Sequence, residues 1–363
     1  MSWDQVVGHR NVLERFRKSA RRNRLASTYL FVGPSGIGKR TFALQLAKSL
    51  LCRQSADDEL EACGECPSCQ QLVAGSHPDL IRVSRPEDKK FIPVETFIGK
   101  EGQRRQQGLV HDIGLKPFYG GRRIALIDDA DHLNAEGANS LLKTLEEPPP
   151  RSILILIGTS QQKQIQTILS RSQVIHFSAL EPGQVRQIIE TEQLIEGDVD
   201  LDKIIQAANG SVEMAVRLSD PELLEFVDLL YRQLASLDPG QEDFGSSLTA
   251  FVDAAGKDSK LKRQRLFEVG DFAVNLYRDL LHRSAGSTDQ QANLDLHGQS
   301  ALDRFRESGF SDDVIQQAVA ACIRRTLTLQ SEVHANAMPA NAIASWLTDL
   351  GRLCRAELGF ETV

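Results

Sequence analysis

The sequence predicts an α/β domain with a parallel sheet in the first half of the chain and a region made of helices in the second half. Two observations carry this prediction. Short apolar runs such as "STYLFVG" and "SILILIG" alternate with segments of helical spacing up to about residue 178, which is the order of elements in a parallel sheet. After that point apolar residues recur every three or four positions, with almost no strand-like alternation.

The first loop of the predicted sheet, "GPSGIGKRT" at residues 33–41, differs from a phosphate-binding loop at one position. In the pattern G-x-x-x-x-G-K-[ST], backbone N–H groups surround the phosphates, the lysine supplies positive charge and the hydroxyl binds magnesium. The loop keeps its glycines and its lysine, namely Gly33, Gly36, Gly38 and Lys39. A glycine turn without any ligand is the simpler interpretation, but the order of strand, loop and helix favours descent from a nucleotide site.

Arg40 stands where the metal-binding hydroxyl belongs. Thr41 cannot replace that hydroxyl, because one residue along a helix turns a side chain by about 100°. The sequence therefore argues against nucleotide turnover, whereas weak binding of ATP with magnesium stays open because Lys39 is retained. Arg40 itself could fill the vacated phosphate pocket or pair with Asp128.

Composition and charge restrict the function classes. The chain has 363 residues, of which 41% are apolar and 25% charged, as in ordinary globular proteins of two or three domains. The net charge of −7 argues against nucleic acid binding over the whole surface, yet residues 1–50 carry ten Lys or Arg and two Asp or Glu. Their arginines at 15–24 could contact a phosphate backbone or form a solvated helix face. Because the start has no signal-peptide pattern, we expect a cytoplasmic protein.

Four of the six cysteines lie close together in the pattern C-x10-C-x2-C-x2-C. In a reducing compartment this spacing indicates a metal site rather than disulfides. Tetrahedral thiolate coordination suits a structural zinc ion, and an iron–sulfur cluster is the competing interpretation. The ferredoxin continuation C-x3-C-P is absent, so we favour zinc. The predicted metal ligands are Cys52, Cys63, Cys66 and Cys69.

A second element of a nucleotide site follows in "GGRRIALIDDADHLN" at residues 120–134, where a short apolar strand ends in Asp128 and Asp129. An acidic residue at the carboxyl end of such a strand can reach the magnesium ion, which is the role we assign to Asp128. The next position usually holds a Glu that polarises the attacking water. Asp129 is one methylene shorter, which could misplace that water. Alone, this pair could be a strand end followed by a helix cap.

The segment "GANSLLKTLEEPPPRSILILIGTS" predicts an amphipathic helix, a stop at three prolines and a buried strand that ends at Thr159. We include Thr159 in the predicted nucleotide site. Further along, Arg171 in "TILSRS" precedes another strand-like segment, "QVIHF". An isolated arginine is usually no more than part of the solvated surface.

Together, "VVGHRNVLERF", "GPSGIGKRT", the four cysteines, "IALIDDADHLNAEGANSLLKTLEEPPP" and "TILSRS" resemble the clamp-loader proteins of bacterial DNA polymerase III. The resemblance is clear over residues 1–220 and is most specific at "NSLLKTLEEPP", which is typical of the clamp-loader branch of the AAA+ proteins. Delta-prime subunits are the most similar branch, since the ATPase subunit tau is usually much longer.

This resemblance implies three domains. They are a RecA-like AAA+ domain at 1–178 with a zinc-binding insert at 52–69, a small helical lid at 179–220, and an all-α collar at 221–363 that oligomerises. The implied partners are gamma/tau and delta subunits in a hetero-pentamer, with the sliding clamp and primer-template DNA reached through the complex. The implied role is that of a stator in DNA replication, as a component of the DNA polymerase III holoenzyme with little or no ATPase activity of its own.

The resemblance also gives Arg171 a role. Family delta-prime subunits carry a Ser-Arg-Cys motif whose arginine reaches the ATP of a neighbouring subunit. Here the motif reads Ser170-Arg171-Ser172, so the arginine is kept and the cysteine is lost. An arginine supplied in trans neutralises charge on the transferred phosphoryl group, which does not require that its own chain be active.

Two other interpretations make different predictions. A self-sufficient ATPase of the gamma/tau kind would have Thr or Ser at position 40, Glu at 129 and Arg at 213, whereas the chain has Arg40, Asp129 and Glu213. A zinc-stabilised nucleic-acid-binding module would have basic residues interleaved with stacking aromatics, but aromatics make up only 6% of the chain.

Two stretches have no account in the family pattern. Residues 85–110, rich in Lys, Arg and Gln, make the connection before the Asp128 strand longer than we expect, and part of them could be a lineage-specific loop. The polar, Gly/Ser-containing residues 282–300 predict a mobile loop between two helices of the collar.

Overall fold

A computed structural model describes residues 3–56, 58–86, 89–104, 106–236, 242–286 and 296–357 of the chain. The chain divides into two compact units. The first comprises Met1–Leu194 with Gly210–Met214, and the second comprises Ile195–Asn209 with Ala215–Val363. The predicted boundaries of a lid and a collar, at residues 178 and 220, stay a prediction.

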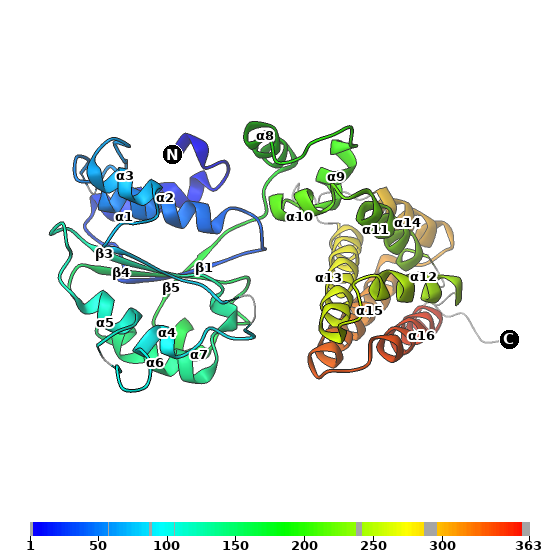
Figure 1. Cartoon of the computed structure of the whole chain (residues 1–363). Coiled ribbons are helices and arrows are strands. Elements are labelled where there is room, and N and C mark those ends of the chain that lie inside the picture. The colour runs from blue at the N-terminus through cyan, green and yellow to red at the C-terminus, as the bar shows by residue number, and fades with distance from the viewer. Residues whose placement is uncertain are drawn as a thin grey trace. The chain divides into compact units, whose positions relative to one another are not determined.

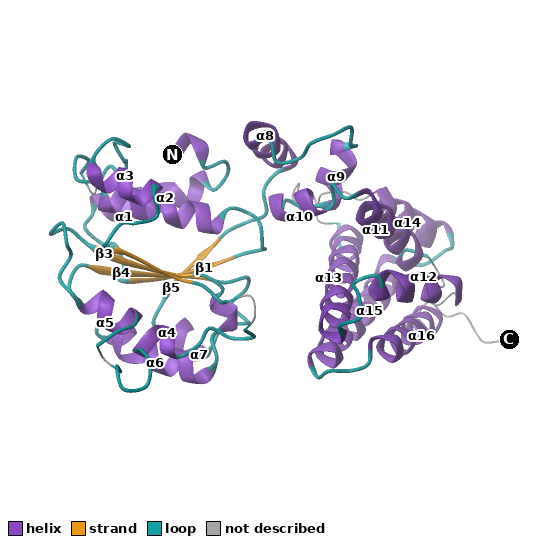
Figure 2. Cartoon of the chain, in the orientation of Figure 1, coloured by secondary structure: helices purple, strands orange, loops and turns teal. Residues whose placement is uncertain are grey.

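A five-stranded parallel sheet forms the centre of the first unit, with the strand order β2-β3-β4-β1-β5. Helices cover both of its faces (Figure 2). The alternation of strands and helices in the sequence therefore predicted the class of fold correctly. The strands are β1 (Thr28–Val32), β2 (Leu80–Val83), β3 (Arg123–Ile127), β4 (Ser152–Ile157) and β5 (Gln173–His176).

The helices of the first unit form two layers, with α1, α2 and α3 on one face of the sheet and α4, α5, α6 and α7 on the other (Figure 1). Their bounds are η1 (Trp3–Gln5), α1 (Arg10–Arg21), α2 (Lys39–Leu51), α3 (Pro67–Val73), α4 (Glu95–Ile98), α5 (Leu109–Gly114), η2 (Ala130–His132), α6 (Ala135–Glu146), α7 (Gln166–Leu169) and α8 (Pro182–Glu192).

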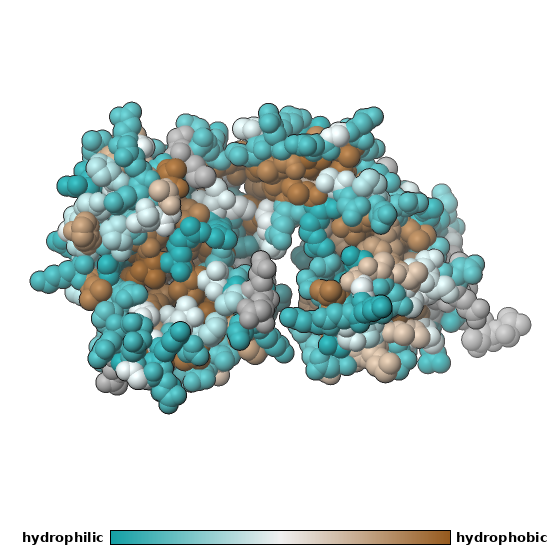
Figure 3. Space-filling view, in the orientation of Figure 1, coloured by the Kyte–Doolittle hydropathy of each residue, from teal (hydrophilic) through white to brown (hydrophobic). Residues whose placement is uncertain are grey.

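Alternate residues of each central strand serve the two layers, because successive side chains of a strand point to opposite faces. In β1, Leu30 and Val32 belong to the core beneath α4–α7. Phe31 lies in an aromatic cluster on the other face, with its ring centroid 5.0 Å from Phe177 and 6.0 Å from Phe42. In the space-filling view, hydrophobic residues show between the two helical layers, where the strands lie (Figure 3).

The long connection before β3 is packed into the fold at both ends, which the sequence did not reveal. Ile92 and Phe97 are fully buried, and Phe97 joins the core of the α4–α7 face. Gly99 and Gly108 bring the two ends of the intervening loop together, and a Cβ on Gly108 would lie only 2.7 Å from the Phe97 carbonyl oxygen. Ile92 and Phe97 of this connection therefore belong to the core, whereas Lys89, Lys90 and Phe91 just before them are exposed.

The second unit is helical throughout its described residues (Figure 2). Its longest helices, α13 and α15, pack along each other (Figure 1). The helices are α9 (Leu201–Ala207), α10 (Val212–Arg217, which begins in the first unit), α11 (Pro221–Leu234), α12 (Glu242–Asp253), α13 (Ser259–Ser284), α14 (Leu296–Glu307), α15 (Asp312–His334) and α16 (Pro339–Glu357).

The predicted mobile loop at 282–300 is wrong at both of its ends, which are helical. Helix α13 continues through Ser284 and α14 already begins at Leu296, while residues 287–295 lie outside the described part of the chain. Among the described helices, none is both long enough and apolar enough to cross a membrane.

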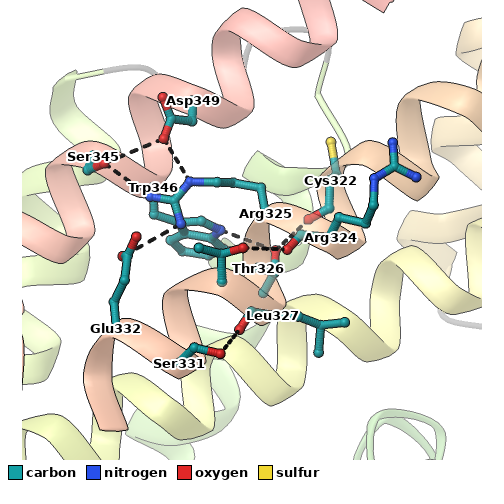
Figure 4. Close-up of polar contacts among 11 residues, drawn as sticks. Cys322, Arg324, Arg325, Thr326, Leu327, Ser331, Glu332, Ser345, Trp346 and Asp349 are labelled. Atoms are coloured by element: carbon teal, nitrogen blue, oxygen red, sulfur yellow. Dashed lines mark hydrogen bonds and ion pairs between the residues drawn. The ribbon is translucent and has the colours of Figure 1, made fainter. Parts of the chain in front are cut away.

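A buried tryptophan and an arginine join α15 to α16 (Figure 4). Trp346 is fully buried, and its indole N–H donates to Thr326 Oγ1 at 3.1 Å. Beside it, Arg325 donates from Nε to Asp349 at 2.7 Å and from Nη2 to Ser345 at 3.1 Å. The pairing of these two helices therefore combines a large apolar side chain with a polar network at its edge.

Trp346 should carry much of the stability of this helix pair. Trp346→Ala removes a fully buried ring and the N–H group that donates to the Thr326 hydroxyl, so we expect the free energy of unfolding to fall by about 3–5 kcal/mol. Leu327→Ala on the same α15 is the matched control, because Leu327 is 47% exposed and should cost less than about 1 kcal/mol. Urea denaturation followed by circular dichroism measures both, and equal losses would contradict the prediction.

Candidate functional site

The phosphate-binding loop lies between the carboxyl end of β1 and the first turn of α2, as the sequence predicted. Gly33 follows the strand so tightly that a Cβ there would lie 2.3 Å from the Phe177 carbonyl oxygen. Gly38, with φ of 90°, precedes Lys39, the first residue of α2. Thr41 is exposed on the first turn of that helix. The backbone of the loop therefore adopts a conformation that requires glycine at positions 33 and 38.

The side chain of Lys39 points back at the phosphate-binding loop that precedes it. The side chain is buried, with 6% of its surface exposed, and Nζ donates to the carbonyl oxygens of Gly33, at 2.7 Å, and of Pro34. Burial lowers the pKa of Lys39 to about 8, although three carboxylates, those of Asp131, Asp128 and Glu213, oppose the shift. The ammonium group that would contact a phosphate is thus held by backbone oxygens and is surrounded by acidic groups.

Arg40 pairs with Asp128, which is one of the two arrangements that the sequence suggested for it. Its Nε lies 3.2 Å from Asp128 Oδ2. Burial raises the pKa of Asp128, while Arg40 opposes this shift and Asp129 adds to it. In an active site of this class, a loop hydroxyl and the strand-end aspartate share the magnesium ion. Here the guanidinium supplies the positive charge beside that aspartate.

The other two predicted residues at this edge are engaged in separate contacts. Asp129, in the left-handed region at φ 55°, accepts a hydrogen bond from the backbone N–H of Arg85 at 3.3 Å. Thr159 donates to Asp131 from its backbone N–H at 2.9 Å and from Oγ1 at 2.5 Å, and Gln164 donates to the same carboxylate. Sequence analysis missed Asp131, whose only signal was a third acidic residue after the β3 strand.

Glu213 belongs to a segment that packs against the phosphate-binding loop. Ser35 Oγ donates to Glu213 Oε2 at 2.8 Å, and the N–H of Val212 donates to the Gly36 carbonyl at 2.9 Å. A Cβ on Gly36 would lie 2.5 Å from Glu213 Cβ, so only glycine fits beneath this segment. The carboxylate of Glu213 thus lies next to the phosphate-binding loop.

Arg171 lies apart from these groups, after α7, and is held within its own chain. Its Nε and Nη2 donate to Glu146 Oε1 at 2.9 and 2.5 Å, and its Nη1 donates to Ser170 Oγ at 2.9 Å. Glu146 is the last residue of α6. The next residue, Ser172, buries its hydroxyl without a hydrogen-bond partner among the described residues.

The four predicted metal ligands come together at the end of α2 and the start of α3. The Sγ atoms of Cys52, Cys63, Cys66 and Cys69 all lie within 4.8 Å of one another. Backbone N–H groups point at the sulfurs: that of Cys66 donates to Cys63 at 3.3 Å, and that of Cys69 donates to Cys66 at 3.5 Å. The arrangement could hold one metal ion.

The chemistry of these thiols fits a cation. Burial opposes ionisation of Cys52, but N–H groups, the first from Cys63, lower its pKa to about 6. Burial raises the pKa of Cys69 to about 12, and the neighbouring cysteines Cys66 and Cys52 raise it further. Four thiolates so close together require a positive charge among them, and a bound metal ion deprotonates its thiol ligands.

The sequence is similar to known subunits of DNA polymerase III. The profile of a family described as "DNA polymerase III, delta subunit" matches residues 8–181. Subunit delta' of DNA polymerase III from Bacillus subtilis is 29% identical over 90% of this chain and 91% of its own length. The delta' subunit from Pseudomonas aeruginosa is 32% identical over 61% of this chain and 66% of its own.

Subunit tau/gamma of DNA polymerase III from Haemophilus influenzae is 33% identical over 59% of this chain. The match spans only 30% of the length of that protein.

The cysteine cluster should bind one equivalent of metal. We expect wild-type protein, purified under reducing conditions, to contain one zinc ion per chain and no iron by elemental mass spectrometry. Cys66→Ser should lose the metal because it removes one of four converging thiolates. Cys322→Ser is the matched control, because Cys322 lies on α15 outside the cluster. Unchanged metal content in Cys66→Ser would refute the site, and iron with labile sulfide would identify a different group.

Proposed function

We propose that this chain, which belongs to the clamp-loader family of bacterial AAA+ proteins, is the delta-prime subunit of the DNA polymerase III clamp-loader complex. In this role it acts in the cytoplasm as a stator that helps place the sliding clamp on primed DNA during replication. Its partners are gamma/tau and delta subunits, and it meets the clamp and the DNA through the complex.

The single observation that carries this proposal is the ion pair between Arg40 and Asp128, 3.2 Å apart. A nucleotide bound with magnesium needs the carboxylate of Asp128 for the metal, and Arg40 already neutralises it. Glu213 over the loop adds a second obstacle, because a carboxylate repels the phosphates that the family arginine would attract. Both features support a subunit that has lost its own ATPase activity.

Arg171 supports the second part of the role, an arginine finger for the ATP of a neighbouring subunit. It keeps the position of the family motif, and its side chain is about one third exposed beside Glu146. The similarity to B. subtilis delta' over nine tenths of both chains also favours delta-prime. A catalytic gamma/tau subunit, the alternative, would need a loop hydroxyl at position 40.

Within this proposal the four cysteines hold a structural zinc ion, which would fix the insert between α2 and β2. The ligands are four thiolates without an open position, so the metal would not activate water. The helical second unit supplies the surfaces that such a subunit needs for assembly. The residues of the retired nucleotide site are those of the loop and the sheet edge: Gly33, Gly36, Gly38, Lys39, Arg40, Thr41, Asp128, Asp129 and Thr159.

Arg171 should be needed by the complex and not by the isolated chain. We expect the chain alone to show no ATP turnover. In a complex with its cognate gamma/tau and delta subunits, Arg171→Ala should silence the one adjoining site, because a finger contributes about 10³–10⁵ in rate at the site that it serves. Steady-state ATPase assays with clamp and primed DNA measure the loss.

The matched control for this assay is Arg186→Ala, which removes an arginine from a surface ion pair, 3.7 Å from Glu190, on α8 of the same unit. The two variants should assemble equally by gel filtration. Robust turnover by the isolated wild-type chain would contradict the proposal, and so would an Arg171→Ala complex with the full ATPase rate.

Restoring the hydroxyl should restore nucleotide affinity in part. Arg40→Thr removes the ion pair with Asp128 and supplies a magnesium ligand, so we expect the dissociation constant for ATP with magnesium to fall at least about tenfold, since one charge-assisted contact is worth about 1.5–3 kcal/mol. Arg40→Ala removes the pair without supplying a ligand and should gain less. Titration of a fluorescent ATP analogue measures all three proteins. Equal affinity of wild type and Arg40→Thr would show that Arg40 does not block the site.

A further inference from the structure

A second polar hollow lies at the edge of the sheet opposite the phosphate-binding loop. All strands are parallel, so they begin at this edge and end at the other, where the loop follows β1 (Figure 1). The hollow has a volume of about 490 Å³ and is lined by the end of α2 and by the turns that precede β2, β3 and β4. This volume is within the range of about 300–1,000 Å³ found for sites of small ligands.

Three arginines from three different segments meet at this hollow, which we call the arginine pocket: Arg53, Arg122 and Arg151. The only acidic residue in its lining is Asp79. Asp79 is 1% exposed and already accepts the backbone N–H groups of Phe118 and Tyr119, at 2.7 and 3.1 Å, together with Nε of Arg123 at 3.3 Å. The negative charge in the wall is therefore compensated by Arg123, while Arg53 and Arg151, which contact a ring and a carbonyl oxygen, add positive charge to the pocket.

Contacts within the chain hold the residues that line the arginine pocket in place in the absence of a ligand. The guanidinium of Arg53 lies 5.1 Å above the Tyr119 ring, and Arg151 Nη1 donates to the Gly120 carbonyl at 3.0 Å. On the other wall, His77 Nε2 lies 2.8 Å from Ser68 Oγ, and Ser68 also donates to the Leu51 carbonyl. Ser68 lies between Cys66 and Cys69, and Arg53 directly follows Cys52, so this wall of the pocket adjoins the four cysteines.

We propose that the arginine pocket binds a small ligand that carries a phosphate group. A guanidinium presents several N–H donors in a fixed plane that matches phosphate oxygens, and such contacts are charge-assisted. The three arginines converge on one hollow rather than following a line, which suits a compact anion better than an extended phosphate backbone. The ring of Tyr119 offers an apolar surface beside the charge, so an organic phosphate ester fits better than the free ion.

This site is separate from the retired nucleotide site and does not depend on the proposed role in a clamp loader. Its ligand enters at the amino ends of the strands, whereas Lys39 and Arg40 lie at the carboxyl ends. The two anion sites can therefore be told apart by substitution. Lys39→Gln changes only the loop, and the double variant Arg53→Gln/Arg151→Gln changes only the arginine pocket.

The experiment is isothermal titration of the full-length protein with phenyl phosphate at constant ionic strength. We expect saturable binding with one site per chain. The double variant should weaken it at least tenfold, and Lys39→Gln should leave it unchanged. Arg324→Gln is the matched charge control, because Arg324 is an exposed arginine of α15 in the other unit (Figure 4). Benzoate, with the same ring and a carboxylate, should bind at least tenfold more weakly than phenyl phosphate.

Several results would overturn the proposal. They are no saturable binding by wild type at millimolar phenyl phosphate, loss of binding in Lys39→Gln, equal losses in Arg324→Gln and the double variant, or benzoate that binds as tightly as the phosphate ester. Metal content and thermal melting of each variant show whether it is folded. If the double variant loses its metal, Arg151→Gln alone takes its place, because Arg151 lies before β4 and far in sequence from the cysteines.

Discussion

The parallel order of the strands is the constraint on which the rest of the first unit depends. Because all five strands run in one direction, the loops after β1, β3 and β4 meet at one edge, although the loop after β1 is more than 90 residues from the other two in sequence. Lys39 and Arg40 bring two positive charges to that edge, and four carboxylates surround them: Asp128, Asp129, Asp131 and Glu213. The two cationic side chains therefore already lie close to carboxylates in the absence of a ligand. An anionic triphosphate would enter a region with an excess of negative charge.

Local sequence patterns predicted the parts of this arrangement that depend on short spacing. The loop glycines, the strand end at Asp128 and the four cysteines are each defined within fewer than twenty residues, so their positions in the fold could be predicted from the sequence. The alternation of apolar runs likewise predicted the parallel sheet. In each of these features, the residues that form it are close together in the sequence.

Contacts across the fold could not be predicted in this way. Asp131 matters because β4 brings Thr159 to within 2.5 Å of it, and nothing in "IDDADH" marks the third aspartate over the second. The short strand β2 has two half-buried residues and an exposed one, which gives it no strong apolar run. Phe97 looked like part of a polar insertion, but Gly99 and Gly108 allow the chain to fold back and bury it. In each case the decisive partner is distant in sequence.

The contact between Arg171 and Glu146 raises the question of whether a paired arginine can serve a neighbouring subunit. The pair is half exposed, with side chains 32% and 49% accessible, and exposed ion pairs contribute only about 0–1 kcal/mol. A hydrogen bond from the same guanidinium to a phosphate is worth about 1.5–3 kcal/mol. A nucleotide on a neighbouring subunit can therefore compete successfully for Arg171, and until then Glu146 restricts its long side chain to few rotamers, which lowers the entropy lost on binding. Pairing within the chain and action in trans are thus compatible.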